Sequence, residues 1–405
     1  MGDRSGVTES DNAALRASGL AHLLAISGLH LGMVAGAVYL VLRLALALPH
    51  GFALRYPAHK FAAVGAILAA IVYLGLSGGA PPAQRAFVTV VAAMTAILAD
   101  RLRSGLWFVA WAAVVVTAAS PDVVVGPSFQ LSFAAATAIV AAYEVLAARR
   151  RREDEPVFAR LGSTRPVASY VAGILGASLL ATLATAPLAL AHFQQAPAFG
   201  VVANLAAMPA MAFVIMPMAI LAGCLSLIGL AAPALQVMAL GIEFVLAAAH
   251  TVAGWQGGVV RASASPDWVV FAFLAGGVLV CALRGWPRVL ALAGPAVAIY
   301  GLATAMPPDV LVAGGADLAA FVRDDALYVT SMRRGRFEQE VWVRQVAAAA
   351  VRPVKAAAPE WARCDDRGCA ATIKGRRVAV SYAPSGLAAD CRAADLVVAL
   401  HAASV

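Results

Sequence analysis

Long apolar runs, separated by short polar or basic stretches, fill most of the chain up to about residue 306. About ten of these runs approach the length of about 20 residues that a helix needs to cross a bilayer. The pattern therefore predicts an all-α polytopic membrane domain of about ten transmembrane helices over residues 20–306. The predicted helices run over 20–42, 61–77, 83–99, 105–119, 128–147, 167–190, 201–222, 232–253, 267–283 and 287–306.

The pattern changes near Met306. Beyond it come short β-type runs, separated by Gly, Asp and Arg, such as "DVLVAGG", "ALYVTSM", "RRVAVSY" and "ADLVVAL". Runs of this kind are typical of strands. Residues 307–405 are therefore predicted to form a small soluble C-terminal domain, α/β or mostly β, whereas residues 1–19 form a polar lead-in.

Composition supports a membrane location. Hydrophobic residues make up 62% of the chain and charged residues 13%, whereas soluble domains are about half apolar and a quarter charged. The net charge of +8 would also suit a nucleic-acid-binding protein. Cytoplasmic loops of membrane proteins, however, carry an excess of Lys and Arg, so the net charge alone does not decide between these classes.

The distribution of basic residues predicts an orientation. The odd-numbered loops hold 13 Lys or Arg residues, and the even-numbered loops hold 2. The positive-inside rule then places the odd loops in the cytoplasm and both the N-terminus and the C-terminal domain on the outer, periplasmic side. The tail cysteines fit an oxidising compartment, where one disulfide would form and one thiol would remain; they are Cys364, Cys369 and Cys391.

The first apolar run carries polar side chains and evenly spaced glycines. At 100° per residue, Ser27 and His30 fall opposite the glycine face, and His22 lies between the two faces. The polar groups either link neighbouring helices or face a polar conduit. A metal site is disfavoured, because the histidines are eight residues apart with no carboxylate or thiol nearby. The glycines form a small-xxx-small pattern that favours close helix packing: Gly28, Gly32 and Gly36.

Two further polar groups stand at the starts of apolar runs. In "SGGAPPAQRAFV", a Gly/Pro turn precedes Gln84 and Arg85. Arg85 either extends its side chain to the membrane interface or lines a path for anions, since arginine suits phosphate. Gln130, in "GPSFQLSFAAATA", either bonds to a neighbouring helix or lines the same path.

Residues 181–217 combine helix-breaking and polar residues. His192 and Asn204 stand among prolines, each of which frees a backbone carbonyl one turn earlier. Kinked helices with free carbonyls beside polar side chains are typical of transport pathways, although they also occur as simple packing kinks. The predicted kinks lie at Pro187, Pro209 and Pro217.

No motif for a cofactor is found in the sequence. Walker, GxGxxG and HExxH patterns are absent, and the tail holds a single histidine, His401. A dinuclear metal hydrolase needs a cluster of His and Asp ligands, which the tail does not contain. We therefore expect no metal, no cofactor and no nuclease activity.

Four stretches, in this order, resemble the ComEC family of bacterial competence proteins: "GLAHLLAISGLHLG", "GLSGGAPPAQRAFV", "FQLSFAAA" and "TLATAPLALAHF" with "GVVANLAAMPAMAFVIMP". The resemblance implies an inner-membrane channel that imports single-stranded DNA during natural transformation. It also implies contact with membrane lipid, a periplasmic DNA receptor, the cytoplasmic translocation machinery and, in a homo-oligomer, further copies of the chain.

The chain departs from the family pattern at both ends. It begins near the junction that follows the family's OB-like domain, so we expect an N-terminally truncated form. Its tail resembles a degenerate metallo-β-lactamase-like domain without the HxHxDH ligands.

Three alternatives remain open from the residues alone. A membrane-embedded enzyme would use Ser27 as nucleophile and His30 or His192 as base. A small-solute secondary transporter would suit Glu243, which shares a face of its predicted helix with His250. The chain could also be a non-functional fragment of a DNA-uptake channel.

Overall fold

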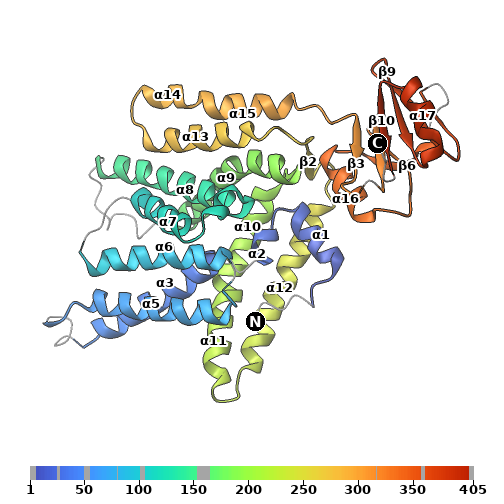
Figure 1. The fold of residues 1–405 in the computed structure, drawn as a ribbon. Coiled ribbons are helices and arrows are strands. Elements are labelled where there is room, and N and C mark those ends of the chain that lie inside the picture. The colour runs from blue at the N-terminus through green and yellow to red at the C-terminus, as the bar shows by residue number, and fades with distance from the viewer. Residues whose placement is uncertain are drawn as a thin grey trace. The chain divides into compact units, whose positions relative to one another are not determined.

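The computed structural model describes residues 6–24, 28–49, 55–79, 81–100, 105–152, 165–315, 317–356 and 361–400. The chain forms two compact units. The first comprises Met1–Leu188, Ala196–Val260 and Ala272–Pro295, and it is helical apart from short β segments (Figure 1). The second comprises Ala189–Gln195, Arg261–Phe271 and Ala296–Val405, and it holds two four-stranded sheets.

The helices follow the apolar runs of the sequence. Their bounds are α1 Glu9–Ala17, α2 Ala21–Leu24, α3 Gly28–Ala47, α5 Ala58–Leu76, α6 Pro81–Leu98, α7 Gly105–Ala119, α8 Pro127–Arg152, α9 Arg165–Phe193, α10 Gly200–Ala210, α11 Met216–Ser226, α12 Ala232–Ala253, α13 Trp268–Ala282, α14 Pro287–Ala291 and α15 Ala293–Ala303. A short two-stranded sheet pairs β1 (Gln195–Pro197) with β2 (Val259–Arg261).

Six helical stretches among the described residues are long and apolar enough to cross a membrane. They are His30–Ala47, Ala58–Leu76, Pro127–Ala148, Ala168–Phe193, Gly200–Ser226 and Ala232–Ala253. The other four predicted runs correspond to shorter apolar helices, Ala83–Leu98, Gly105–Ala119, Trp268–Ala282 and Pro287–Ala303. A mostly helical membrane region is confirmed, whereas the count of ten spanning helices is not.

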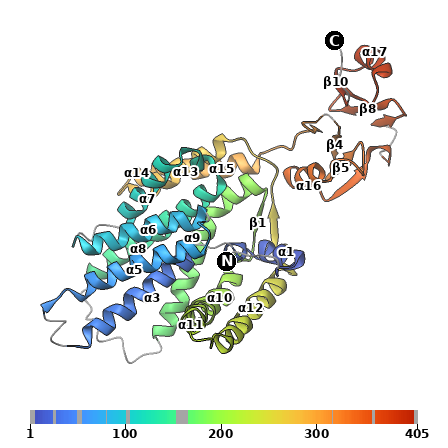
Figure 2. The ribbon, with the colours of Figure 1, turned by 60° about the horizontal axis from the view of Figure 1, so that its bottom comes forward.

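The first predicted run, 20–42, contains two described helices, and residues 25–27 between them lie outside the described residues. The short helix α2 ends at Leu24, and α3 begins at Gly28. Leu23 of α2 is buried in a core with α1 and α10–α12, and Met33 and Val34 of α3 also pack against that core. Helix α3 lies beside α5 and α6 (Figure 2), where its Leu31 is buried in a second core. Among the described residues, the first candidate membrane span begins at His30, about ten residues later than the start of the predicted run.

The stretch 200–226 is continuous, although it contains two prolines. Between α10 and α11 it passes through a π turn, Met211–Ile215, in which the Met216 N–H bonds to the Met211 carbonyl. Single π turns of this kind often mark functional sites. The widened turn is accommodated by Gly241 of α12, where a Cβ atom would come within 2.8 Å of the Ile215 side chain.

The C-terminal region contains β-sheets, as the change of pattern near Met306 predicts. One sheet has the strand order β3-β4-β5-β6 and the other β10-β9-β8-β7. The strands are β3 Val310–Val312, β4 Ala319–Arg323, β5 Ala326–Val329, β6 Ala350–Pro353, β7 Ala362–Cys364, β8 Gly368–Ile373, β9 Arg376–Ser381 and β10 Leu396–Ala399. Two helices, α16 (Arg336–Gln345) and α17 (Pro384–Ala393), complete the region.

Strand β5 shows how the tail is layered. Tyr328 lies in a core shared with the second sheet, where its ring centroid is 5.0 Å from that of Trp361. The neighbouring Leu327 and Val329 point to the opposite face, into a core that includes Trp342 of α16. This alternation is the period-2 pattern of a strand buried on both faces.

Candidate functional site in the membrane domain

Arg85 is the most unusual side chain of the membrane domain. It lies in the second turn of α6 and is only 7% exposed. Its Nη2 atom donates to the main-chain oxygen of Ser128 at 3.0 Å and to the Ser128 hydroxyl at 2.8 Å. Its Nε atom is buried and has no acceptor among the residues that the structure describes. Arg85 thus connects α6 to the start of α8 and retains an unused donor.

Within the described part of the chain, no carboxylate pairs with Arg85; the ion pairs there belong to other residues. A charged side chain within an apolar helical domain is costly and marks a functional site by default. A buried donor without an acceptor costs about 1–3 kcal/mol. The arrangement therefore suits an anionic acceptor that comes from outside the chain.

The two predicted glutamines each bond to the turn that precedes their own helix, Gln84 before α6 and Gln130 before α8. The exposed Gln84 donates from Nε2 to the Gly79 carbonyl at 2.8 Å. Gln130 is 5% exposed and donates from Nε2 to the Val124 carbonyl at 3.0 Å. Both contacts are local and stabilise the entry into α6 and α8, and a role in lining a path stays a prediction.

The two histidines of the first apolar run lie on separate helices, α2 and α3. His30 is 7% exposed in the first turn of α3. His22, on α2, donates from Nδ1 to the Gly19 carbonyl at 2.9 Å. Gly19 has a φ of +82°, and a Cβ atom there would come within 2.8 Å of Pro197. Ser27 lies outside the described residues.

The predicted helix packing of Gly28, Gly32 and Gly36 stays a prediction. Among the described residues, a Cβ atom at Gly32 or Gly36 would meet no atom within 4 Å. The packed face is formed instead by Leu31 and Ala35, which are 0% and 1% exposed against α5 and α6. Small residues spaced by four permit close approach, but the larger apolar side chains beside them determine which face is buried.

The prolines and polar residues of the region 181–217 lie on three different helices, α9, α10 and α11. Pro187 and Pro209 lie inside helices, and Pro217 stands in the first turn of α11, directly after the π turn. Asn204, on α10, has a buried Oδ1 atom to which no group in the described part of the chain donates. His192 is half-buried near the end of α9. The conduit role of these residues stays a prediction.

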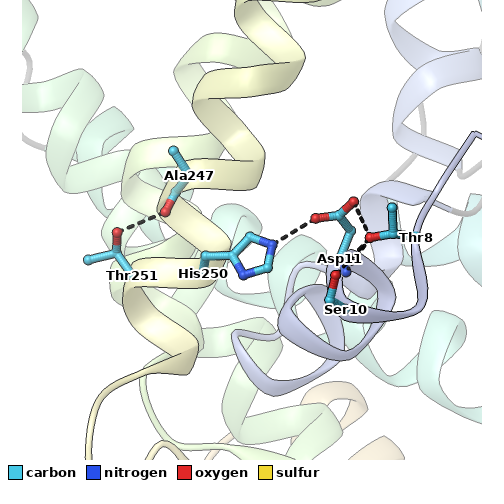
Figure 3. A network of polar contacts seen from close by, with 6 residues as sticks. All are labelled: Thr8, Ser10, Asp11, Ala247, His250 and Thr251. Atoms are coloured by element: carbon cyan, nitrogen blue, oxygen red, sulfur yellow. Dashed lines mark hydrogen bonds and ion pairs between the residues drawn. The ribbon is translucent and has the colours of Figure 1, made fainter.

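A polar network that the sequence does not reveal joins α1 to α12. His250 Nε2 lies 2.7 Å from Asp11 Oδ1, and the Thr8 hydroxyl donates to Asp11 Oδ2 at 2.6 Å (Figure 3). The hydrogen bond from His250 holds the pKa of the Asp11 carboxyl below its usual range. His250 therefore pairs with a residue 239 positions away, and the sequence offers no local signal for that contact.

The tail cysteines are partly paired. Cys364 and Cys369 face each other across the β7–β8 hairpin and are joined by a disulfide. Cys391 is a free, exposed thiol on α17. In the described part of the chain, no group of three or more His, Cys, Asp or Glu side chains is arranged to hold a metal ion.

Comparisons with known proteins bear on the helical region. The chain is 27% identical over 231 residues to "Uncharacterized protein YcaI" of Escherichia coli (strain K12), a match that covers 56% of this chain and 28% of that protein. It is 29% identical over 222 residues to "ComE operon protein 3" of Bacillus subtilis (strain 168), and this match covers 54% of this chain and 25% of that protein. These matches span only about a quarter of each relative. No solved structure matches the chain.

The model of the Competence protein family matches residues 1–287, which include Arg85, Ser128, the π turn and the Asp11–His250 contact. The match covers well over half of the chain and ends before the β-sheet region begins. The chain therefore belongs to the Competence protein family.

Proposed function

We propose that the helical region forms the membrane part of a conduit that passes single-stranded DNA into the cytoplasm. Membership of the Competence protein family supports a role in DNA uptake. The name "ComE operon protein 3" of the Bacillus relative points in the same direction. In this proposal, both the N-terminus and the tail lie on the periplasmic side, and a periplasmic DNA receptor, the cytoplasmic translocation machinery and further copies of the chain are its partners.

The single observation that carries the proposal is the buried guanidinium of Arg85. Phosphate oxygens are strong acceptors for guanidinium groups, and the strand would present one after another as it passes. Ser128 holds the Nη2 atom, and the Nε atom, which has no acceptor among the described residues, remains for such an anion. A fixed cation that binds each phosphate through few contacts would attract the strand without trapping it.

Two of the three alternatives, the membrane-embedded enzyme and the small-solute transporter, lack a comparable observation. The nucleophile of the enzyme alternative, Ser27, lies outside the described residues. The carboxylate of the transporter alternative, Glu243, is exposed on α12, and His250 on the same helix bonds to Asp11.

Binding of single-stranded DNA as a function of salt tests the proposal. The full chain in lipid nanodiscs is titrated with a fluorescent 20-nucleotide oligo(dT) at several salt concentrations. Each phosphate contact lowers the slope of log K against log salt by about 0.7 for single strands. Arg85→Gln should therefore weaken binding about tenfold and reduce the slope by about 0.7, because one phosphate contact is lost.

Arg43→Gln is the matched control, because Arg43 is an exposed arginine on α3. It should retain wild-type affinity and slope. A wild-type chain that binds no DNA at low salt would overturn the proposal, and so would equal effects of both substitutions.

A further inference from the structure

An exposed cluster of arginines and apolar side chains stands out on the C-terminal domain. It begins in the loop before α16 and continues into the first turn of that helix. Phe337 is 73% exposed and Met332 is 47% exposed, although both are large and apolar. We call this set the arginine surface, and its members are Met332, Arg333, Arg334, Arg336 and Phe337.

The backbone beneath the arginine surface is held in place. The Ser331 hydroxyl accepts the N–H groups of both Arg333 and Arg334, each at 3.3 Å. The buried Gln339 side chain donates to the Ser331 carbonyl at 2.9 Å and to the Arg334 carbonyl at 2.7 Å. The exposed side chains therefore project from a defined turn.

The charge of the surface is not neutralised by the chain itself. Within the described residues, none of its three arginines takes part in an ion pair. Residues 331–344 contain four arginines against two glutamates, Glu338 and Glu340. A groove of about 480 Å³ lies beside the surface, with Met332, Arg336 and Arg344 among its lining residues. The whole stretch is thus a basic, partly apolar surface beside a concave site.

The chain length limits where this domain can go. The last apolar helix, α15, ends at Ala303, and β3 begins at Val310. The six intervening residues reach at most about 20 Å when fully extended. With the apolar helices α14 and α15 in the membrane, a bilayer surface is within reach of the domain, at a high effective concentration.

From these observations we infer that the arginine surface docks on the anionic lipid headgroups of the membrane that holds the helical region. Arg333, Arg334 and Arg336 would bind lipid phosphates, and Phe337 and Met332 would enter the boundary between headgroups and acyl chains. Basic side chains next to exposed aromatic and apolar ones are the combination that binds at this boundary. The inference rests on the membrane location of the chain and not on the passage of DNA.

Limited trypsin cleavage of the full chain in nanodiscs tests this inference. The cleavage rate after Arg333, Arg334 and Arg336 is compared between phosphatidylcholine nanodiscs and nanodiscs that contain equal parts of phosphatidylglycerol. Cleavage after Lys374, in the exposed β8–β9 turn, and after Arg376, the exposed first residue of β9, serves as the internal reference. Docking should slow cleavage of the arginine surface at least fivefold relative to this reference in the anionic nanodiscs.

Two variants sharpen the result. Phe337→Ser should restore at least half of the lost cleavage, because it removes the apolar anchor and keeps every cleavage site. Leu396→Ser, which removes another exposed apolar side chain (52% exposed) from the same domain, should leave the protection unchanged.

Equal relative cleavage in both lipids would overturn the inference, and so would protection that Phe337→Ser leaves intact. Protection by added oligo(dT), but not by phosphatidylglycerol, would also overturn it and would indicate a nucleic-acid surface. If trypsin cuts these sites in neither lipid, hydrogen exchange of the 333–338 amides in the same two nanodiscs decides between the same outcomes.

Discussion

A few side chains in this protein make contacts that composition does not explain. Arg85 is buried and bonded to Ser128, and the guanidinium retains an unused donor. Asp11 and His250 connect the N-terminal helix to α12. At the scale of the residue, the first of these contacts relates to function and the second to the stability of the N-terminal segment.

The contact between Asp11 and His250 gives a pH prediction. The lowered pKa of Asp11 means that its ionised form is favoured in the folded state. Its stabilising contribution is therefore present above the unfolded pKa of about 3.9 and is lost as the pH falls through the lower folded pKa. Asp11→Asn should lower the unfolding temperature at pH 7, and the difference from wild type should be smaller at pH 3.

Thermal unfolding in nanodiscs at the two pH values measures this effect. Glu9→Gln, in the same first turn of α1, is the control and should lower the unfolding temperature less at pH 7. An Asp11→Asn deficit that persists unchanged at pH 3 would show that the carboxylate charge is not what stabilises the contact.

At the scale of the element, close packing of helix backbones occurs at a place that the spacing of glycines did not predict. A Cβ atom at Gly276 of α13 would come within 2.8 Å of the Gly294 backbone and 2.5 Å of Pro295. A Cβ atom at the next residue, Gly277, would meet no atom of the described residues within 4 Å. The two adjacent glycines of α13 therefore differ sharply in the space around them.

Substitutions at these glycines should have correspondingly different effects. Gly276→Leu should abolish or strongly reduce the yield of folded protein, and Gly276→Ala should destabilise it by about 1–3 kcal/mol, because the backbones cannot separate without loss of packing. Gly277→Leu and Gly32→Leu should both fold at near wild-type yield. Yield after size-exclusion chromatography and unfolding temperature measure the difference, and a Gly32→Leu variant as damaged as Gly276→Leu would contradict the packing described here.

The β7–β8 hairpin makes a second prediction at this scale. Because the disulfide closes a short loop, replacing Cys364 and Cys369 together by Ser should destabilise the tail by about 2 kcal/mol. In membranes kept oxidising, thiol labelling without reductant should modify Cys391 and spare the other two. Labelling of all three tail cysteines would contradict both the pairing and the proposed periplasmic location.

The relation between sequence and fold differs from one element to another. Apolar length and β-type runs predict the helical region and the sheets of the tail, because burial depends on the average character of a segment. Contacts between distant side chains are not encoded in any local period. The contact of Arg85 with Ser128 spans 43 residues and that of Asp11 with His250 spans 239, so neither partner is predictable from a single sequence, although Arg85 itself is noticeable as a cation in an apolar run.

At the scale of the whole molecule, the distribution of basic residues predicts one orientation. The bias of 13 basic residues in odd loops to 2 in even loops places the loop around Gly162 in the cytoplasm and the C-terminus outside. A reporter that is active only in the cytoplasm should be active after Gly162 and inactive after Val405. Activity at both positions would require an even number of spans between them and would remove the proposed periplasmic tail.

The proposed conduit is a property of the whole chain, and entry of DNA into sealed vesicles tests it most directly. The full chain is reconstituted into proteoliposomes, labelled oligo(dT) is added outside, and external nuclease then removes every strand that has not entered. The account predicts that DNA becomes protected, that Arg85→Gln lowers the rate of protection about tenfold, and that Arg43→Gln does not. Protein-containing vesicles that protect no more DNA than empty ones, although the chain is folded and binds DNA, would contradict the account.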